Sequence, residues 1–117
     1  MGTNQTIIYF NPQCSKCRMT LELLNKKGTE PEVVEYLQST PSKAELTEIL
    51  TKLGLSADQL LRKHEGAYQE AGLNDSSSEE EILDAMTKFP ILIERPIVVH
   101  NGKAAIGRPP ENILDIL

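Results

Sequence analysis

One stretch near the start of the chain decides the fold, IIYFNPQCSKCR from Ile7 to Arg18. Its first four residues are an apolar run typical of a strand, and the segment from Ser15 to Lys27 has leucines at helical spacing. The only two cysteines, Cys14 and Cys17, lie where the strand meets the helix. The first turn of a helix exposes N–H groups and partial positive charge, which stabilise a thiolate. The stretch therefore predicts a reactive thiol at a strand-to-helix turn.

Three interpretations of the cysteine pair compete. Two cysteines can be small buried hydrophobic residues, but these lie at the polar start of a helix. A zinc site needs about four ligands, and the other donors of the usual kind, His64 and His100, are isolated in the sequence. A Cys-x-x-Cys motif beside a β-α-β pattern is typical of redox chemistry. We therefore expect redox or thiolate-nucleophile chemistry and no metal site.

Composition narrows the class of protein. A chain of 117 residues with 39% hydrophobic content fits one globular domain, residues 1–117, with a largely aliphatic core. A net charge of −5 argues against nucleic acid as a partner. No apolar run approaches the length of a membrane span, and Met1–Gln5 lacks the pattern of a signal peptide. We expect a cytoplasmic protein with reduced cysteines, and a monomer, since no heptad pattern demands a dimer.

The four arginines lie in segments with motif character, whereas the lysines are scattered. They are Arg18, Arg62, Arg95 and Arg108. The planar fork of a guanidinium suits an oxyanion better than the point charge of a lysine. Two interpretations stay open at this point: four unrelated surface residues, or an arginine cluster that binds an oxyanion beside the thiolate.

The order of predicted elements indicates a thioredoxin-like α/β fold. The strand at 7–10, a helix ended by Gly28 and a strand over 32–37 form a β-α-β unit. Capping and apolar spacing predict four helical segments in an insert at about 40–90: Ser42 to Leu53, Ser56 to Leu61, Glu65 to Ala71, and Ser78 to Phe89.

The end of the chain predicts the remaining β-β-α. A strand over 97–99 leads into Asn101-Gly102, a strong hairpin signal, and 103–106 forms the return strand. Pro109 and Pro110 suit the start of a helix, and its apolar residues are expected to face the core: Ile113, Leu114 and Leu117. In a thioredoxin-like fold, the proline before the third strand, Pro96, is expected to be cis and to face the cysteine loop.

The chain resembles the ArsC family of glutaredoxin-dependent arsenate reductases over essentially its whole length. The matching segments, in order, are Asn11-Pro12-x-Cys14-Ser15-Lys16, Gly28-Thr29-Glu30-Pro31, Tyr36-Leu37, Pro41-Ser42, Leu60-Leu61-Arg62-Lys63, Phe89 to Val99, and Gly107-Arg108-Pro109-Pro110-Glu111. Asn101 to Ala104 and Ile106 to Glu111 are most similar to the short YfgD-type branch; the resemblance to Spx is more distant.

The resemblance implies a division of labour within the site. Cys14 is expected to attack arsenate, which is held by an oxyanion clamp of Arg62, Arg95 and Arg108 with the backbone around Ser15. Asn11, Arg18 and Pro96 are expected to support the site. Glutathione serves as co-substrate and glutaredoxin as partner, with no tightly bound cofactor, and the product is arsenite.

The chain departs from the family pattern at two positions near the thiol. The family often has histidine at the position of Phe10, so we expect any lowering of the Cys14 pKa to come from the helix end, Arg18 and the clamp. Cys17 lies at a position where the family commonly has serine or another residue. It is a possible resolving or redox partner of Cys14. Two alternatives therefore stay open: a thiol–disulfide oxidoreductase that uses Cys14 and Cys17, or a redox-sensing transcriptional regulator like Spx.

Overall fold

A computed structural model describes residues 6–117; Met1–Gln5, on which the signal-peptide prediction depends, lies outside the described residues. The chain forms two compact units. We call Met1–Ser39 with Arg95–Leu117 the sheet unit, and Thr40–Glu94 the helical unit. The helical unit contains the predicted insert, and whether the two units make one domain stays a prediction.

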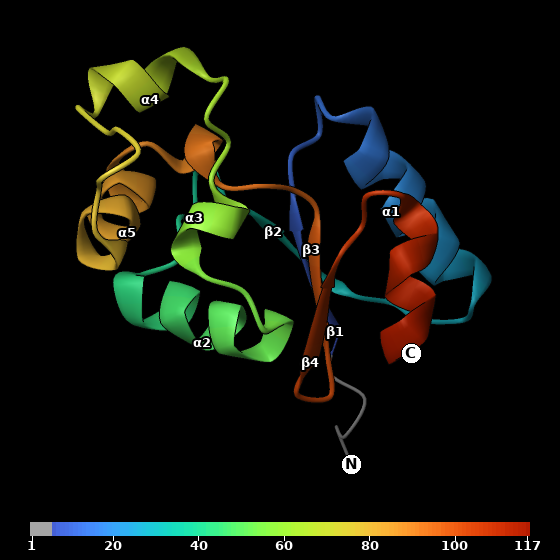
Figure 1. The fold of residues 1–117 in the computed structure, drawn as a ribbon. Helices are drawn as coiled ribbons and strands as arrows, with labels where there is room; N and C mark the ends of the chain where they lie inside the picture. The colour runs from blue at the N-terminus through green and yellow to red at the C-terminus, as the bar shows by residue number, and fades with distance from the viewer. Residues whose placement is uncertain (1–5) are drawn as a thin grey trace. The chain divides into compact units, whose positions relative to one another are not determined.

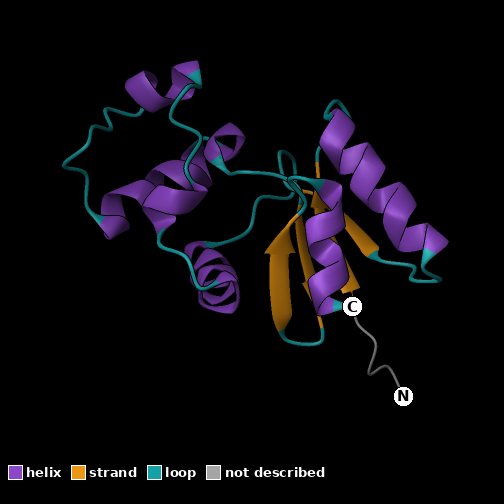
Figure 2. Cartoon of the chain, turned by 45° about the vertical axis from the view of Figure 1, so that its right-hand side comes forward, coloured by secondary structure: helices purple, strands orange, loops and turns teal. Residues whose placement is uncertain are grey.

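The sheet unit is built on four strands in the order β2-β1-β3-β4. β1 (Thr6–Phe10) pairs parallel with β2 (Glu32–Glu35) and antiparallel with β3 (Ile97–His100), which pairs antiparallel with β4 (Lys103–Ile106). Figures 1 and 2 show this mixed sheet. The order is the thioredoxin-like one, so the predicted fold class is confirmed. The second strand ends at Glu35 rather than Leu37, because the N–H groups of Gln38 and Ser39 turn back to the Glu35 carbonyl.

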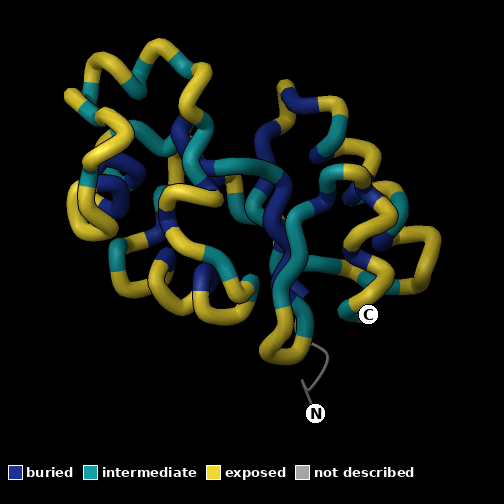
Figure 3. The backbone as a smooth tube through the Cα atoms, viewed as in Figure 1, coloured by how far each residue is buried: buried dark blue, intermediate teal, exposed yellow. Residues whose placement is uncertain are grey.

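The two central strands carry the core of the sheet unit, as the dark blue of Figure 3 shows. Along β1, buried residues alternate with half-buried ones, and Ile97, Val98 and Val99 of β3 are all buried. Both strands have a neighbour on each side, whereas β2, at the sheet edge, is mostly exposed. Apolar area removed from water stabilises this arrangement.

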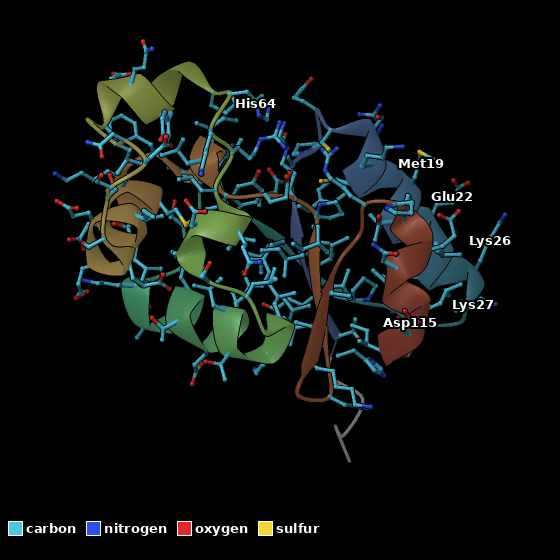
Figure 4. The ribbon with its side chains drawn as sticks, in the orientation of Figure 1. Met19, Glu22, Lys26, Lys27, His64 and Asp115 are labelled. Atoms are coloured by element: carbon cyan, nitrogen blue, oxygen red, sulfur yellow. The ribbon has the colours of Figure 1, made fainter. Side chains whose placement is uncertain are left out.

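Helix α1 (Ser15–Lys26) packs beside the 3₁₀ helix η2 (Pro110–Ile116), as Figure 1 shows. Gly28 lies just past its end with φ +77°, a left-handed conformation that favours glycine. Cys17 and Leu24 are buried inward. Figure 4 shows Met19, Glu22 and Lys26 on the outside of α1.

The prediction that Leu114 and Leu117 face the core is wrong. They are 39% and 41% exposed, while Ile113 is fully buried and Ile116 packs against the core. The segment is a 3₁₀ helix rather than an α-helix. Three residues per turn place positions i, i+3 and i+6 on one face, so Pro110, Ile113 and Ile116 face inward.

The helical unit consists of α2 (Lys43–Leu53), α3 (Ala57–Leu60), α4 (Gly66–Glu70), α5 (Glu79–Lys88) and the 3₁₀ helix η1 (Pro90–Leu92). The predicted capping boxes at Ser42 and Ser78 are confirmed, and Ser56 forms a third one with Gln59. Phe89, predicted to extend the apolar face of α5, is only half-buried and ends the helix. The apolar faces of α2 and α5 supply buried residues of the helical unit: Leu46, Ile49, Leu50, Ile82, Leu83 and Met86. Within residues 6–117, no helix has the length and apolarity needed to cross a membrane.

Candidate active site

The loop between β1 and α1 is held by its own hydrogen bonds. The side-chain Oδ1 of buried Asn11 accepts the Gln13 N–H at 2.9 Å, and the Asn11 carbonyl accepts the Cys14 N–H at 2.9 Å. From the outer side, Arg18 Nη1 donates to the Pro12 carbonyl at 2.8 Å. These bonds place Cys14 at the N-cap of α1 in an extended conformation. Asn11 therefore holds the loop that carries Cys14, and its supporting role in the site stays a prediction.

Two arginines from the far end of the sequence reach the sulfur of Cys14. Arg108 Nη2 donates to Cys14 Sγ at 3.5 Å, and its Nε donates to the Arg95 carbonyl at 2.6 Å. The Arg95 guanidinium also acts on Cys14, since it lowers the pKa of that thiol. Cys14 itself is only 7% exposed. The sheet unit thus assembles a thiol and two guanidinium groups from positions more than eighty residues apart.

Burial raises the pKa of Cys14, but the other influences on its sulfur outweigh burial. The backbone N–H and side chain of Cys17, followed by Arg95, lower the pKa of Cys14 to about 7. The predicted effect of the helix N-terminus is confirmed, because the Cys17 N–H belongs to the first turn of α1. The contribution expected from the clamp comes from Arg95. Arg18, also expected to contribute, is not among the causes; it is exposed and binds the Pro12 carbonyl. Cys14 is therefore substantially a thiolate at neutral pH.

Cys17 has the opposite environment although it lies one helical turn away. It is completely buried in the apolar cluster with Ile8, Phe10 and Leu24. Burial, followed by its neighbour Cys14, raises the pKa of Cys17 to about 12 despite the backbone N–H of Asn11, which donates to Cys17 Sγ at 3.5 Å. Both cysteines are free thiols in the structure. Of the two thiols, Cys14 is therefore the one that ionises near neutral pH.

The segments that carry the two arginines are joined by backbone contacts around Pro96. The Arg95–Pro96 bond is cis, as predicted, and the Gly107 N–H donates to the Pro96 carbonyl at 2.9 Å. A Cβ atom on Gly107 would lie 2.5 Å from Thr20 Oγ1 and 2.9 Å from Pro96 Cγ. Glycine is thus the residue that lets the segment after β4, which carries Arg108, lie against both α1 and Pro96. The Arg108–Pro109 bond is also cis, which the sequence did not predict.

Arg62 belongs to the helical unit, where other groups surround its guanidinium. Its Nε pairs with Glu65 at 3.1 Å, its Nη1 pairs with Glu94, and its Nη2 lies 3.0 Å from His64 Nε2. The Arg62 side chain is only 10% exposed. Its place in the oxyanion clamp stays a prediction.

Most of the predicted site residues of the sheet unit come together. Arg108 contacts both Cys14 and Arg95, and the Asn11 backbone N–H contacts Cys17. Ser15 is the exposed first residue of α1. Sequence reasoning missed Gly107, although a glycine directly before a motif arginine is a usable signal for close backbone approach. Among residues 6–117, no three His, Cys, Asp or Glu residues are grouped so that they could hold a metal ion.

The whole chain is similar to known proteins of one family. Residues 9–116 match the model of the ArsC family. The chain is 54% identical to YfgD of Escherichia coli K12, covering 98% of both chains, and 47% identical to an arsenate reductase of Neisseria meningitidis serogroup A, covering 94% of this chain and 96% of that protein. The solved structure of an arsenate reductase from Vibrio cholerae superposes with a TM-score of 0.94 at 44% identity, covering 99% of this chain and 100% of that one.

Proposed function

The chain belongs to the ArsC family, and we propose that it is an oxidoreductase that reduces arsenate to arsenite. One observation carries the proposal: a cysteine with a pKa of about 7 stands at a helix N-terminus in contact with two arginines. A thiolate beside guanidinium groups both attracts a tetrahedral oxyanion and attacks its central atom.

In the first step, the Cys14 thiolate attacks arsenic and displaces hydroxide. An S–As bond forms, an As–O bond breaks, and arsenic stays in the +5 state. Arg95 and Arg108 orient the anion and stabilise the charge that develops on its oxygens. Arg62 and the backbone N–H groups from Ser15 onward complete this clamp in the proposal, since the N-terminus of α1 favours anions.

In the second step, glutathione supplies the electrons. Its thiolate attacks Cys14 Sγ, so that an S–S bond forms and the electron pair of the S–As bond stays with arsenic, which leaves as arsenite. Glutaredoxin then removes glutathione from Cys14 by thiol–disulfide exchange. This scheme needs no tightly bound cofactor. It fits a monomeric protein that works in the cytoplasm, where both thiols are kept reduced.

A second candidate function, thiol–disulfide exchange by Cys14 and Cys17, is favoured by one observation. Both thiols are free, and the pKa of Cys14 is lowered to about 7 while that of Cys17 is raised to about 12, as in a dithiol that attacks external disulfides. Such an activity needs no arginine clamp, so the convergence of Arg95 and Arg108 on Cys14 favours arsenate. A regulator like Spx would use the same pair as a redox switch. Binding to the RNA polymerase α subunit in a pull-down would favour that alternative.

A coupled assay that follows NADPH oxidation tests the proposed function. The mixture contains arsenate, glutathione, glutathione reductase and glutaredoxin, and each component is left out in turn. We expect turnover that requires arsenate, glutathione and glutaredoxin and that survives Cys17→Ser. Turnover that continues without arsenate, or that depends on Cys17, would contradict arsenate reduction and indicate thiol–disulfide exchange.

A further inference from the structure

Arg108 can orient an anion beside Cys14 only if its guanidinium group is held in one place. Two bonds hold the end of its side chain: Nη2 donates to Cys14 Sγ at 3.5 Å, and Nε donates to the Arg95 carbonyl at 2.6 Å. The direction in which this long, flexible side chain leaves the main chain is set by the backbone of Arg108. The groups that fix this backbone therefore matter for the site.

The backbone of Arg108 lies between the end of β4 and the start of η2. Its N–H donates to the Ile106 carbonyl at 2.9 Å, which closes a tight three-residue turn. Pro109 and Pro110 follow, and neither has an N–H group that could donate to the Arg108 carbonyl. A side chain supplies a donor instead, since Asn112 Nδ2 donates to this carbonyl at 2.9 Å.

Asn112 bonds two successive carbonyls of this segment. Besides the bond from its side chain to Arg108, its backbone N–H donates to the Pro109 carbonyl at 3.0 Å. The next residue, Ile113, has no exposed surface and belongs to the apolar cluster that also contains Cys14. Asn112, although exposed itself, thus connects the backbone of the arginine to the part of η2 that is anchored in the core.

We propose that Asn112 is a positioning residue of the arsenate site, whose side-chain amide holds the backbone of Arg108 so that the guanidinium stays directed at Cys14. It acts on the thiol and on the anion through Arg108. A displacement of about 1 Å near the reacting atoms can cost a large factor in rate. The inference rests on the proposed function for its kinetic test, whereas the contact between Arg108 and Cys14 offers a test that does not need arsenate.

A double-mutant cycle on arsenate reduction tests whether Asn112 acts through Arg108. Asn112→Ala removes the amide but leaves the guanidinium, so we expect kcat/KM for arsenate to fall by about tenfold. In an Arg108→Ala background, the same substitution should change kcat/KM by less than about twofold, because no guanidinium is left to position. A tenfold loss in both backgrounds, or no loss in either, would overturn the proposal.

Asp115→Ala is the matched control. Asp115 is exposed on the same 3₁₀ helix, where Figure 4 labels it. Truncation of this side chain should leave kcat/KM for arsenate near that of the wild type. A loss equal to that of Asn112→Ala would indicate a general effect of truncation on η2 and would contradict a specific role for the amide.

The pH profile of Cys14 alkylation by iodoacetamide, followed by intact mass, tests the same link without arsenate or glutathione. In the wild type, we expect the rate to reach half its maximum at a pH of about 7. Arg108→Ala removes a cation from the sulfur and should raise this midpoint by about one pH unit. Asn112→Ala should raise it by about 0.3–0.5 of a unit, but not further in the Arg108→Ala background.

The two measurements separate this inference from the proposed function. Protein that shows the expected alkylation midpoints without reducing arsenate would contradict the proposed function and support the role of Asn112. A midpoint that does not move in Asn112→Ala, or that moves equally with and without Arg108, would refute that role. If Arg108→Ala does not fold, Arg108→Met serves as the background, since it removes the guanidinium but keeps an apolar stem.

Discussion

The two units of the chain use their arginines in opposite ways. In the helical unit, Arg62 pairs with two carboxylates, those of Glu65 and Glu94, and lies beside His64. In the sheet unit, Arg108 donates hydrogen bonds to the Arg95 carbonyl and to the Cys14 sulfur. Two negative charges anchor the first guanidinium, whereas a neutral carbonyl and an ionisable sulfur hold the second.

This difference separates a guanidinium that stabilises its own unit from one that tunes a neighbouring thiol. A cation beside carboxylates has much of its field cancelled, but a cation beside a thiol favours the thiolate. Arg95 accordingly lowers the pKa of Cys14. The contrast predicts that substitutions in the sheet unit change reactivity, while those around Arg62 change local stability first.

The largest expected effect follows loss of an arginine in the sheet unit. Arg95→Ala and Arg108→Ala should each lower kcat/KM for arsenate by about 10²–10³-fold, the usual cost of one donor to a developing oxyanion. Arg95→Ala should also raise the midpoint of Cys14 alkylation, because Arg95 is among the causes of the lowered pKa. Steady-state kinetics and the alkylation profile measure the two effects separately.

Arg62→Ala is the matched variant for the helical unit. It should leave the alkylation midpoint of Cys14 near that of the wild type, because the groups that lower this pKa belong to the sheet unit. A loss of arsenate kcat/KM with an unchanged midpoint would support Arg62 in the clamp. Equal midpoint shifts in Arg62→Ala and Arg95→Ala would break the comparison between the units.

An intermediate effect is expected at Gly107. In Gly107→Ala, the new methyl group would press on Thr20 Oγ1 and on Pro96 Cγ. Overpacking of this kind costs about 1–3 kcal/mol, which urea denaturation measures as a lower free energy of unfolding. Gly66→Ala in the helical unit is the control, since no atom lies within 4 Å of its Cβ position. A Gly107→Ala protein as stable as Gly66→Ala would refute the close packing described here.

The smallest effect is expected at Glu94, whose carboxylate pairs with Arg62. Glu94→Gln should lower the free energy of unfolding by about 1 kcal/mol, because this ion pair is partly shielded from water. Glu80 pairs with Lys43 at exposed side chains, so Glu80→Gln should cost close to zero. Equal losses in the two variants would show that burial does not distinguish these pairs.

Local signals in the sequence predicted the fold well where the chemistry is local. The capping boxes at Ser42 and Ser78, the Asn101-Gly102 hairpin and the cysteine loop depend on neighbouring residues, and all lie where they were predicted. The prediction that Leu114 and Leu117 face the core was wrong because the apolar spacing was interpreted with an α-helical period. The chain adopts a 3₁₀ period there, between cis Pro109 and the C-terminal residue.

The site was predictable in its residues but less so in its contacts. The motif around Cys14 and the segments with Arg95 and Arg108 were all identified, yet spacing carries no information about which arginine reaches the sulfur. Arg18 is closest to Cys14 in sequence but binds the Pro12 carbonyl. Arg108, far away in sequence, donates to the Cys14 sulfur. The opposite pKa shifts of Cys14 and Cys17 depend on the burial of Cys17 and on the Cys17 N–H and Arg95 beside Cys14, which only the folded chain defines.

The central claim is that the Cys14 sulfur is the nucleophile that reduces arsenate, and direct quantification of arsenite tests it. Wild type, Cys14→Ser and Cys17→Ser are compared at neutral pH with glutathione and glutaredoxin in excess. We predict arsenite from the wild type and from Cys17→Ser, and none above background from Cys14→Ser, since an alcohol is not ionised at this pH. Arsenite formed by Cys14→Ser at the rate of the wild type would contradict the account.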